Sequence, residues 1–298
     1  MKIAVVCAAG IGDGLLMQIA AFHLQRLGCE TVTFSNPLLS LQSWFPRFPF
    51  EKQPALAQVE ERFAPFDAIL LQYDNTPKAK AIRSLNKPVY VFYGSHLISK
   101  HGPLRPTLDA KFDPQFCMAE NIRQGVQILF PGVEPTLENG LTPPNHLLFR
   151  RFAKRVALHP TSSSQEKNWP KVSFFKLRER LHKEGWDPVC IAPPEEREEW
   201  NSPLFATLAD LAAFLYESAY LIGNDSGPGH LASNLGLSTV ILGPNEEHLR
   251  FWRPGWHRCA LAHPPSWVGR TKLTRTNWKN FLTVSNVYKQ FKKLTDIK

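Results

Sequence analysis

The sequence has few cysteines, and they lack the spacings typical of metal ligands or disulfide partners. There are five, at positions 7, 29, 117, 190 and 259, with no Cys-x-x-Cys pair. An odd and scattered set argues against a disulfide framework and against a zinc site. Cys7 and Cys190 stand in apolar, strand-like runs, where a thiol usually packs as a small core residue. We therefore expect no metal site.

Long apolar runs are also missing. No stretch approaches the roughly 18 apolar residues that a membrane-spanning helix needs. The N-terminal run 3–8 is shorter than the apolar region of a signal peptide and leads directly into a glycine turn. We interpret this run as the first buried strand. We expect a cytoplasmic protein, for which peripheral contact with the cytoplasmic face of the inner membrane stays open.

The sequence has fewer acidic than basic residues. Lysine and arginine total 35 against 26 aspartates and glutamates, so the formal net charge is 35 − 26 = +9. This surplus favours an anionic partner such as a nucleotide diphosphate, an anionic glycolipid or a membrane surface. Basic clusters lie at 150–155 and 289–293, but no nucleic-acid-binding signature accompanies them. We therefore expect no nucleic acid partner, and a solvated basic face is an equal alternative for the second cluster.

Apolar periodicity predicts a first array of strands and a helix. The strands are expected at 3–8, 31–34, 66–72 and 89–93, and the helix at 14–27. Proline and aromatic residues are frequent in 36–50, which we expect to be irregular surface structure near a cleft.

A second array follows after Pro143 and Pro144. It predicts strands at 155–160, 188–192, 219–223 and 238–242, and helices at 173–184, 208–218, 229–235 and 284–294. A length of 298 residues suits two domains. The predicted class is α/β: a Rossmann-like domain over 1–150, a second over 151–282, and a terminal helix within 283–298 packed back on the body. Such domains bind ligands at the carboxyl ends of their strands.

The strongest chemical signal is Gly-Asn-Asp-Ser-Gly-Pro-Gly-His at 223–230. It forms a polar turn between a predicted strand and a predicted helix, whose N-terminal N–H groups are a ready anion site. Ser226 and Gly227 can approach a phosphate closely, and His230 can donate a charge-assisted hydrogen bond to it. The structural alternative is a helix cap followed by a core histidine.

Together with 236–245, this segment resembles glycosyltransferase family 9, which contains the ADP-heptose:lipopolysaccharide heptosyltransferases. Three further segments agree in order and spacing: Gly-Ile-Gly-Asp at 10–13, the loop 159–170 with its Lys-Asn-Trp-Pro, and Pro-Pro-Glu-Glu-Arg-Glu at 193–198. The family's glycines are replaced in the last of these. The resemblance is continuous over the C-terminal half and thin over 36–150.

The resemblance implies a GT-B fold, with two doubly wound domains facing across a cleft. It implies an inverting, metal-independent transfer of a heptose or related sugar from a nucleotide diphosphate donor, ADP-heptose, to a lipopolysaccharide core or similar glycolipid. No cofactor besides this donor is implied. Asp13 matches the catalytic base, while Lys167 and His230 would stabilise the leaving diphosphate. The residues implied to bind the donor are Thr161, Ser162, Ser163, Lys167, Glu195, Asp225, Ser226, Gly227 and His230.

Alternatives stay open for several of these residues. Asp13 can also act as a helix N-cap, which does not exclude catalysis; Glu195 can belong to a solvated charged face, and Trp169 is better explained as a hydrophobic brace than as a stacking platform. Gly-x-Gly-x-Gly at 10–14 lacks the dinucleotide-binding spacing. Two other functions also stay open: a GT-B-type sugar-nucleotide epimerase, and a non-catalytic nucleotide-sugar-binding module. Four basic residues are unranked candidates for acceptor phosphates: Arg47, Lys78, Lys80 and Arg105.

Overall fold

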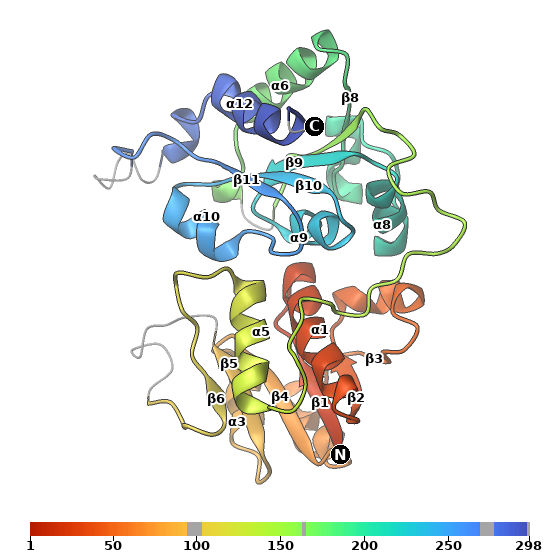
Figure 1. Cartoon of the computed structure of the whole chain (residues 1–298), viewed down its shortest axis with the longest axis vertical. Coiled ribbons are helices and arrows are strands. Elements are labelled where there is room, and N and C mark those ends of the chain that lie inside the picture. Colours follow the sequence, from red (N-terminus) through yellow and green to blue (C-terminus); the bar gives the residue numbers. More distant parts are fainter. Residues whose placement is uncertain (94–102, 163–164, 269–276, 297–298) are drawn as a thin grey trace. The chain divides into compact units, whose positions relative to one another are not determined.

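The chain forms two compact units, Met1–Thr142 and Pro143–Lys298, each built on one parallel sheet (Figure 1). The computed structural model describes residues 1–93, 103–162, 165–268 and 277–296. The units divide earlier than the boundary that the sequence predicts near residue 150. The connecting segment already contacts the second unit before residue 151: the Phe149 ring packs on Tyr216 at a centroid distance of 5.3 Å, and Arg150 N–H donates to the Tyr216 carbonyl at 3.0 Å.

The first unit holds a six-stranded sheet in the order β3-β2-β1-β4-β5-β6. Its strands are β1 (Lys2–Val6), β2 (Glu30–Phe34), β3 (Phe50–Glu51), β4 (Ala68–Tyr73), β5 (Val89–Tyr93) and β6 (Asp109–Ala110). All the described pairs are parallel. The strand order reverses between β1 and β4, which is the switch point at which ligands bind in doubly wound folds.

Helices cover both faces of this sheet. They are α1 (Ile11–Arg26), η1 (Pro37–Trp44), η2 (Leu56–Gln58), α2 (Val59–Phe63), α3 (Pro77–Arg83) and α5 (Met118–Leu129). Helix α1 begins three positions earlier than predicted because its first turn accommodates glycines (14 − 11 = 3). A Cβ atom added at Gly14 would lie 2.8 Å from the Leu38 side chain, so the close approach of η1 requires glycine there.

The sequence predicts irregular surface structure for 36–50, and this prediction is wrong. The segment forms η1 and β3, and Leu38, Leu41 and Trp44 are buried. The Gln42 side chain bonds to backbone groups of the following loop, including the Phe48 carbonyl at 2.9 Å. Its proline and aromatic residues therefore extend the core of the first unit.

The second unit holds a five-stranded parallel sheet in the order β11-β10-β9-β7-β8. Its strands are β7 (Arg155–His159), β8 (Asp187–Cys190), β9 (Tyr220–Asn224), β10 (Ser238–Leu242) and β11 (Cys259–Ala262). The order reverses between β7 and β9, so the switch point of this unit lies at the ends of these two strands.

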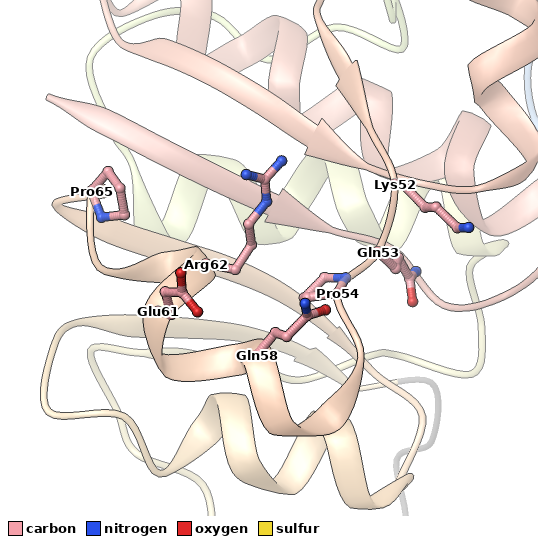
Figure 2. Close-up of a pocket in the computed structure, with 7 residues that line it drawn as sticks. All are labelled: Lys52, Gln53, Pro54, Gln58, Glu61, Arg62 and Pro65. Carbon is pink, nitrogen blue, oxygen red and sulfur yellow. The ribbon is translucent and has the colours of Figure 1, made fainter.

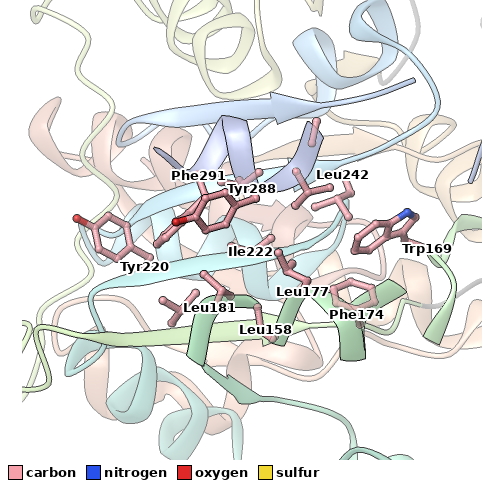
Figure 3. Packing of buried hydrophobic residues seen from close by; sticks show 14 of the residues in the cluster. Leu158, Trp169, Phe174, Leu177, Leu181, Tyr220, Ile222, Leu242, Tyr288 and Phe291 are labelled. Atoms are coloured by element: carbon pink, nitrogen blue, oxygen red, sulfur yellow. The ribbon is translucent and has the colours of Figure 1, made fainter. Parts of the chain in front are cut away.

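Helices and short 3-10 turns connect or follow the strands of the second unit. They are η3 (Gln165–Lys167), α6 (Lys171–Lys183), η4 (Pro194–Glu196), α7 (Arg197–Trp200), α8 (Leu208–Tyr216), α9 (Gly227–Asn234), α10 (Glu246–Trp252), η5 (Trp278–Asn280) and α12 (Val284–Thr295). Figure 3 shows Ile222 of the sheet among Leu177 of α6 and Phe291 of α12. The terminal helix thus packs onto the second unit, against α6, β10 and β11.

The predicted α/β class with two Rossmann-like, doubly wound units is confirmed. Within the described residues, no helix is both long and apolar enough to cross a membrane.

Candidate functional site

Asn224 joins the two loops that meet at the switch point of the second unit. It is the last residue of β9, and its side chain is fully buried. Its Nδ2 donates to the Pro160 carbonyl at 2.7 Å, and its Oδ1 accepts from the Trp169 N–H at 3.1 Å. This amide therefore fixes the loop after β7 against the end of β9.

Ser226 continues this polar network. Its hydroxyl lies 2.9 Å from Nδ1 of His159 and 3.0 Å from the Asn224 carbonyl. Burial lowers the pKa of His159 to about 4, so near neutral pH the ring has one donor and one acceptor nitrogen. When Nδ1 carries the proton, His159 donates to the hydroxyl, whose own proton can reach the Asn224 carbonyl or an incoming anion.

Helix α9 starts directly after this network. Ser226 is its N-cap residue, but the Ser226 side chain does not accept a capping bond from the helix. Pro228 has no N–H, and the Gly229 N–H donates to the Ser226 carbonyl at 3.1 Å, so the Gly227 N–H is the first-turn group that can bind an anion, which the helix dipole also favours. Pro228 fits the first turn because its missing N–H has no helical partner there anyway.

Asp225 and His230 flank the start of α9 in different environments. The Asp225 carboxylate lies 3.2 Å from Nε2 of His248, and both side chains are partly exposed. His230 is buried, with its ring edge-on to Trp256 at a centroid distance of 6.2 Å. His230 therefore has the surroundings of a core histidine, and its contact with a phosphate stays a prediction.

The loop after β7 brings both buried and exposed residues to the candidate site. Thr161 is buried, and the Ser162 hydroxyl donates to Oδ1 of Asn168 at 2.7 Å. Lys167 ends η3 with an exposed side chain. Ser163 lies outside the described residues.

Trp169 is a hydrophobic brace, as the sequence favours. Its ring is almost fully buried beside Phe174 at 5.1 Å, and its Nε1 donates to the Leu282 carbonyl at 2.8 Å. The brace anchors the loop after β7 to the core of the second unit.

Glu195 stands in η4, on the loop that follows β8, and is exposed. Strand β8 is the neighbour of β7, so this loop emerges at the same edge of the sheet. The structure thus brings together, along one edge, the described donor-binding candidates of the second unit: Thr161, Ser162, Lys167, Glu195, Asp225, Ser226, Gly227 and His230.

Asp13 lies at the switch point of the first unit. One carboxylate oxygen accepts from Gly10 N–H at 3.1 Å, and the other accepts from Gln72 Nε2 at 2.7 Å. The buried Gln72 is held in turn, because its Oε1 accepts from Ala8 N–H at 3.0 Å. A Cβ at Gly10 would lie 2.6 Å from the carboxylate, so glycine leaves room for this arrangement. The Asp13 carboxylate is therefore held by two hydrogen bonds, one from the backbone at the start of α1 and one from a side chain of β4.

A cavity of about 350 Å³ opens beside β3 of the first unit (Figure 2). Its lining residues are Lys52, Gln53, Pro54, Gln58, Glu61, Arg62 and Pro65. Gln53 Nε2 donates to the Cys7 carbonyl at 2.6 Å, which ties the cavity to the carboxyl end of β1. Lys78 Nζ donates to Gln53 Oε1 at 2.8 Å and so holds this lining side chain.

Among the basic residues that are candidates for binding acceptor phosphates, Lys78 and Arg105 have different surroundings in the structure. Arg105 is engaged internally, with its NH2 group 2.8 Å from Oδ1 of the buried Asp109. Lys78 bonds to Gln53, which lines the polar cavity, whereas Arg105 stabilises the end of the first sheet.

Sequence reasoning did not single out His159 or Gln72. Both are polar residues that end or nearly end a buried strand, and that position is the signal that could have found them. Among the described residues, no group of three or more His, Cys, Asp or Glu side chains could hold a metal ion.

Residues 144–254 match the model of glycosyltransferase family 9 (heptosyltransferase), and this range includes His159, Asn224 and Ser226. The resemblance to this family is confirmed. Lipopolysaccharide heptosyltransferase 3 of Escherichia coli is 25% identical over 114 residues, and the match covers 33% of this chain and 33% of that protein. The similarity in sequence to this curated relative thus spans about a third of its length.

Solved structures extend the likeness in fold to the whole chain. The glycosyltransferase family 9 structure from Veillonella parvula DSM 2008 matches with a TM-score of 0.73 at 16% identity, covering 100% of this chain and 98% of that one. The E. coli heptosyltransferase WaaC with ADP matches with a TM-score of 0.70 at 16% identity, covering 98% and 99%. The predicted GT-B fold class is confirmed.

Proposed function

We propose that the chain is an inverting, metal-independent glycosyltransferase. It moves a heptose or related sugar from a nucleotide diphosphate donor, ADP-heptose, to a lipopolysaccharide core or similar glycolipid. The family match over 144–254 and the fold shared with a heptosyltransferase that binds ADP support this proposal. The observation that carries it is the network of His159, Asn224 and Ser226 at the start of α9.

The donor diphosphate binds at this network. Ser226 turns its hydroxyl proton to a phosphate oxygen, and His159 holds the hydroxyl oxygen through Nδ1–H. Lys167 and His230 supply positive charge or hydrogen bonds as the diphosphate leaves, because negative charge builds up on its bridging oxygen. Glu195, on the neighbouring loop, accepts hydrogen bonds from the ribose hydroxyls.

The transfer step needs a base on the acceptor side. The Asp13 carboxylate takes the proton of the acceptor hydroxyl while that oxygen attacks the anomeric carbon. The bond from this carbon to the diphosphate oxygen breaks, and the diphosphate leaves with the electron pair, so the anomeric configuration inverts. General base assistance is typically worth about 10²- to 10⁴-fold in rate. Gly10 and Gln72 hold the carboxylate in one orientation.

We assign the acceptor to the first unit, where Lys52 lines the cavity beside β3, whereas Arg62 lines it but is paired with Glu51. The Lys52 ammonium suits an anionic group of a glycolipid. The reaction then takes place on the cytoplasmic side of the membrane that carries the acceptor.

A binding screen followed by a transfer assay tests the proposal. ADP and ADP-heptose are expected to raise the melting temperature more than the UDP and GDP analogues, and Ser226→Ala to weaken this effect. Ser173→Ala, on α6, serves as the matched control. A shift with UDP or GDP compounds alone would contradict the heptose assignment, and no shift with any nucleotide would contradict the donor site.

Product analysis by mass spectrometry separates the alternative functions. We expect a glycosylated acceptor and free ADP when donor and a lipopolysaccharide core acceptor are both present. Conversion of the donor sugar without acceptor would indicate an epimerase. Tight donor binding without product across a broad acceptor panel would indicate a binding module.

A further inference from the structure

A loop just before β7 exposes apolar side chains between cations. We call residues 148–154 the basic-aromatic loop. Leu148 is 62% exposed, Phe149 47% and Phe152 37%. The exposed basic residues between and after them are Arg150, Arg151 and Lys154. Such a dense alternation of large apolar and basic side chains on a surface is typical of an interaction site rather than of scattered exposure.

The backbone of this loop is fixed. Arg150 N–H donates to the Tyr216 carbonyl at 3.0 Å, and Phe152 N–H donates to the Glu217 carbonyl at 2.9 Å, at the end of α8. Arg150 has a φ of 53°, in the left-handed region that residues other than glycine adopt only when the surroundings demand it. The fold therefore fixes the loop with Leu148 62% exposed, while the half-exposed ring of Phe149 packs with one side on Tyr216 at a centroid distance of 5.3 Å.

The charge of the loop is almost entirely positive. Residues 148–155 include no acid. The carboxylate beside the loop, Glu217, is mostly buried and lies 3.7 Å from Arg151 NH1, whose side chain is still 58% exposed. Arg155 is turned inward, with its guanidinium carbon 3.5 Å from the Phe152 ring centroid. The outward face thus combines three cations with apolar groups.

We propose that the basic-aromatic loop docks the protein on an anionic lipid bilayer. At such a surface the cations meet lipid phosphates, while leucine and phenylalanine enter the boundary between headgroups and acyl chains. Nucleic acid would suit the cations but would leave Leu148 exposed. A specific protein partner usually needs about 800 Å² per side, more than one short loop supplies. This docking is independent of the transfer reaction.

Vesicle co-sedimentation of the full chain tests the proposal. The protein is expected to bind vesicles of phosphatidylcholine with phosphatidylglycerol, and to bind phosphatidylcholine alone much more weakly. Each basic side chain strengthens binding about fivefold at an anionic surface, so Arg151→Ala with Lys154→Ala should lower the partition coefficient about 25-fold. Leu148→Ser should lower it about tenfold.

Matched controls lie on α6 of the same unit. Lys176→Ala with Lys183→Ala removes two exposed cations, and Val172→Ser removes a side chain that is 57% exposed. These variants should bind like the unmodified protein, and all variants should keep its melting temperature. Absence of binding, equal binding to both vesicle types, or equal losses in the α6 controls would overturn the proposal. So would binding to duplex DNA without binding to vesicles.

Discussion

Replacing Asn224 with alanine should destabilise the second unit more than any surface change. The substitution leaves the Pro160 carbonyl and the Trp169 N–H, both in buried residues, without the amide that now binds them at 2.7 and 3.1 Å. An unsatisfied buried polar group costs about 1–3 kcal/mol, so the two together cost about 2–6 kcal/mol. For a domain of this size that lowers the melting temperature by on the order of 10 °C.

Urea unfolding followed by tryptophan fluorescence measures this loss. The chain has eight tryptophans, and Trp44 alone belongs to the first unit, so the signal comes mainly from the second. Asn145→Ala, at an exposed position of the same unit, is the matched control. If Asn224→Ala unfolds within about 0.5 kcal/mol of this control, which is the usual range of surface substitutions, Asn224 does not hold the two loops together.

Two further predictions concern the polar partners of the candidate site. In Gln72→Leu, Asp13 loses the hydrogen bond that orients its carboxylate from β4, so the transfer rate at saturating donor should fall about tenfold with the donor Kd unchanged; an unchanged rate would contradict this. Burial lowers the pKa of His159 from 6.5 to about 4. Between these pH values the imidazole takes up a proton only in the unfolded chain. The free energy of unfolding should therefore fall as the pH drops from 6.5 to 4. The shift corresponds to about 3 kcal/mol, and His159→Asn should remove that part of the pH dependence in urea unfolding.

Much of the fold could be predicted from apolar runs. The predicted strands 89–93 and 238–242 coincide with β5 and β10, because strands buried on both faces appear as continuous apolar stretches. Strand β11 was not predicted, since it is short and most of its residues are only half-buried. The burial of η1 was not predicted either, because it depends on side chains from distant parts of the chain.

The candidate site was predicted where its residues are neighbours in sequence, as in the motif 223–230. The residues that hydrogen-bond to the predicted site residues were not predicted, because the sheet brings them together from distant parts of the sequence. Gln72 is 59 residues from Asp13, and His159 is 67 residues from Ser226. These contacts depend on the order and register of the strands, and neither can be deduced from the local sequence.

The proposed transfer reaction is tested most directly by Asp13→Asn, measured as the rate at saturating donor together with the donor dissociation constant. Asparagine keeps the size of the side chain and can still accept from Gly10 N–H, but it cannot take a proton from the acceptor. We expect kcat to fall about 10²- to 10⁴-fold, with the donor Kd unchanged because the donor-binding residues belong to the second unit. A kcat within a few-fold of that of the unmodified protein would contradict the role of Asp13 as the base.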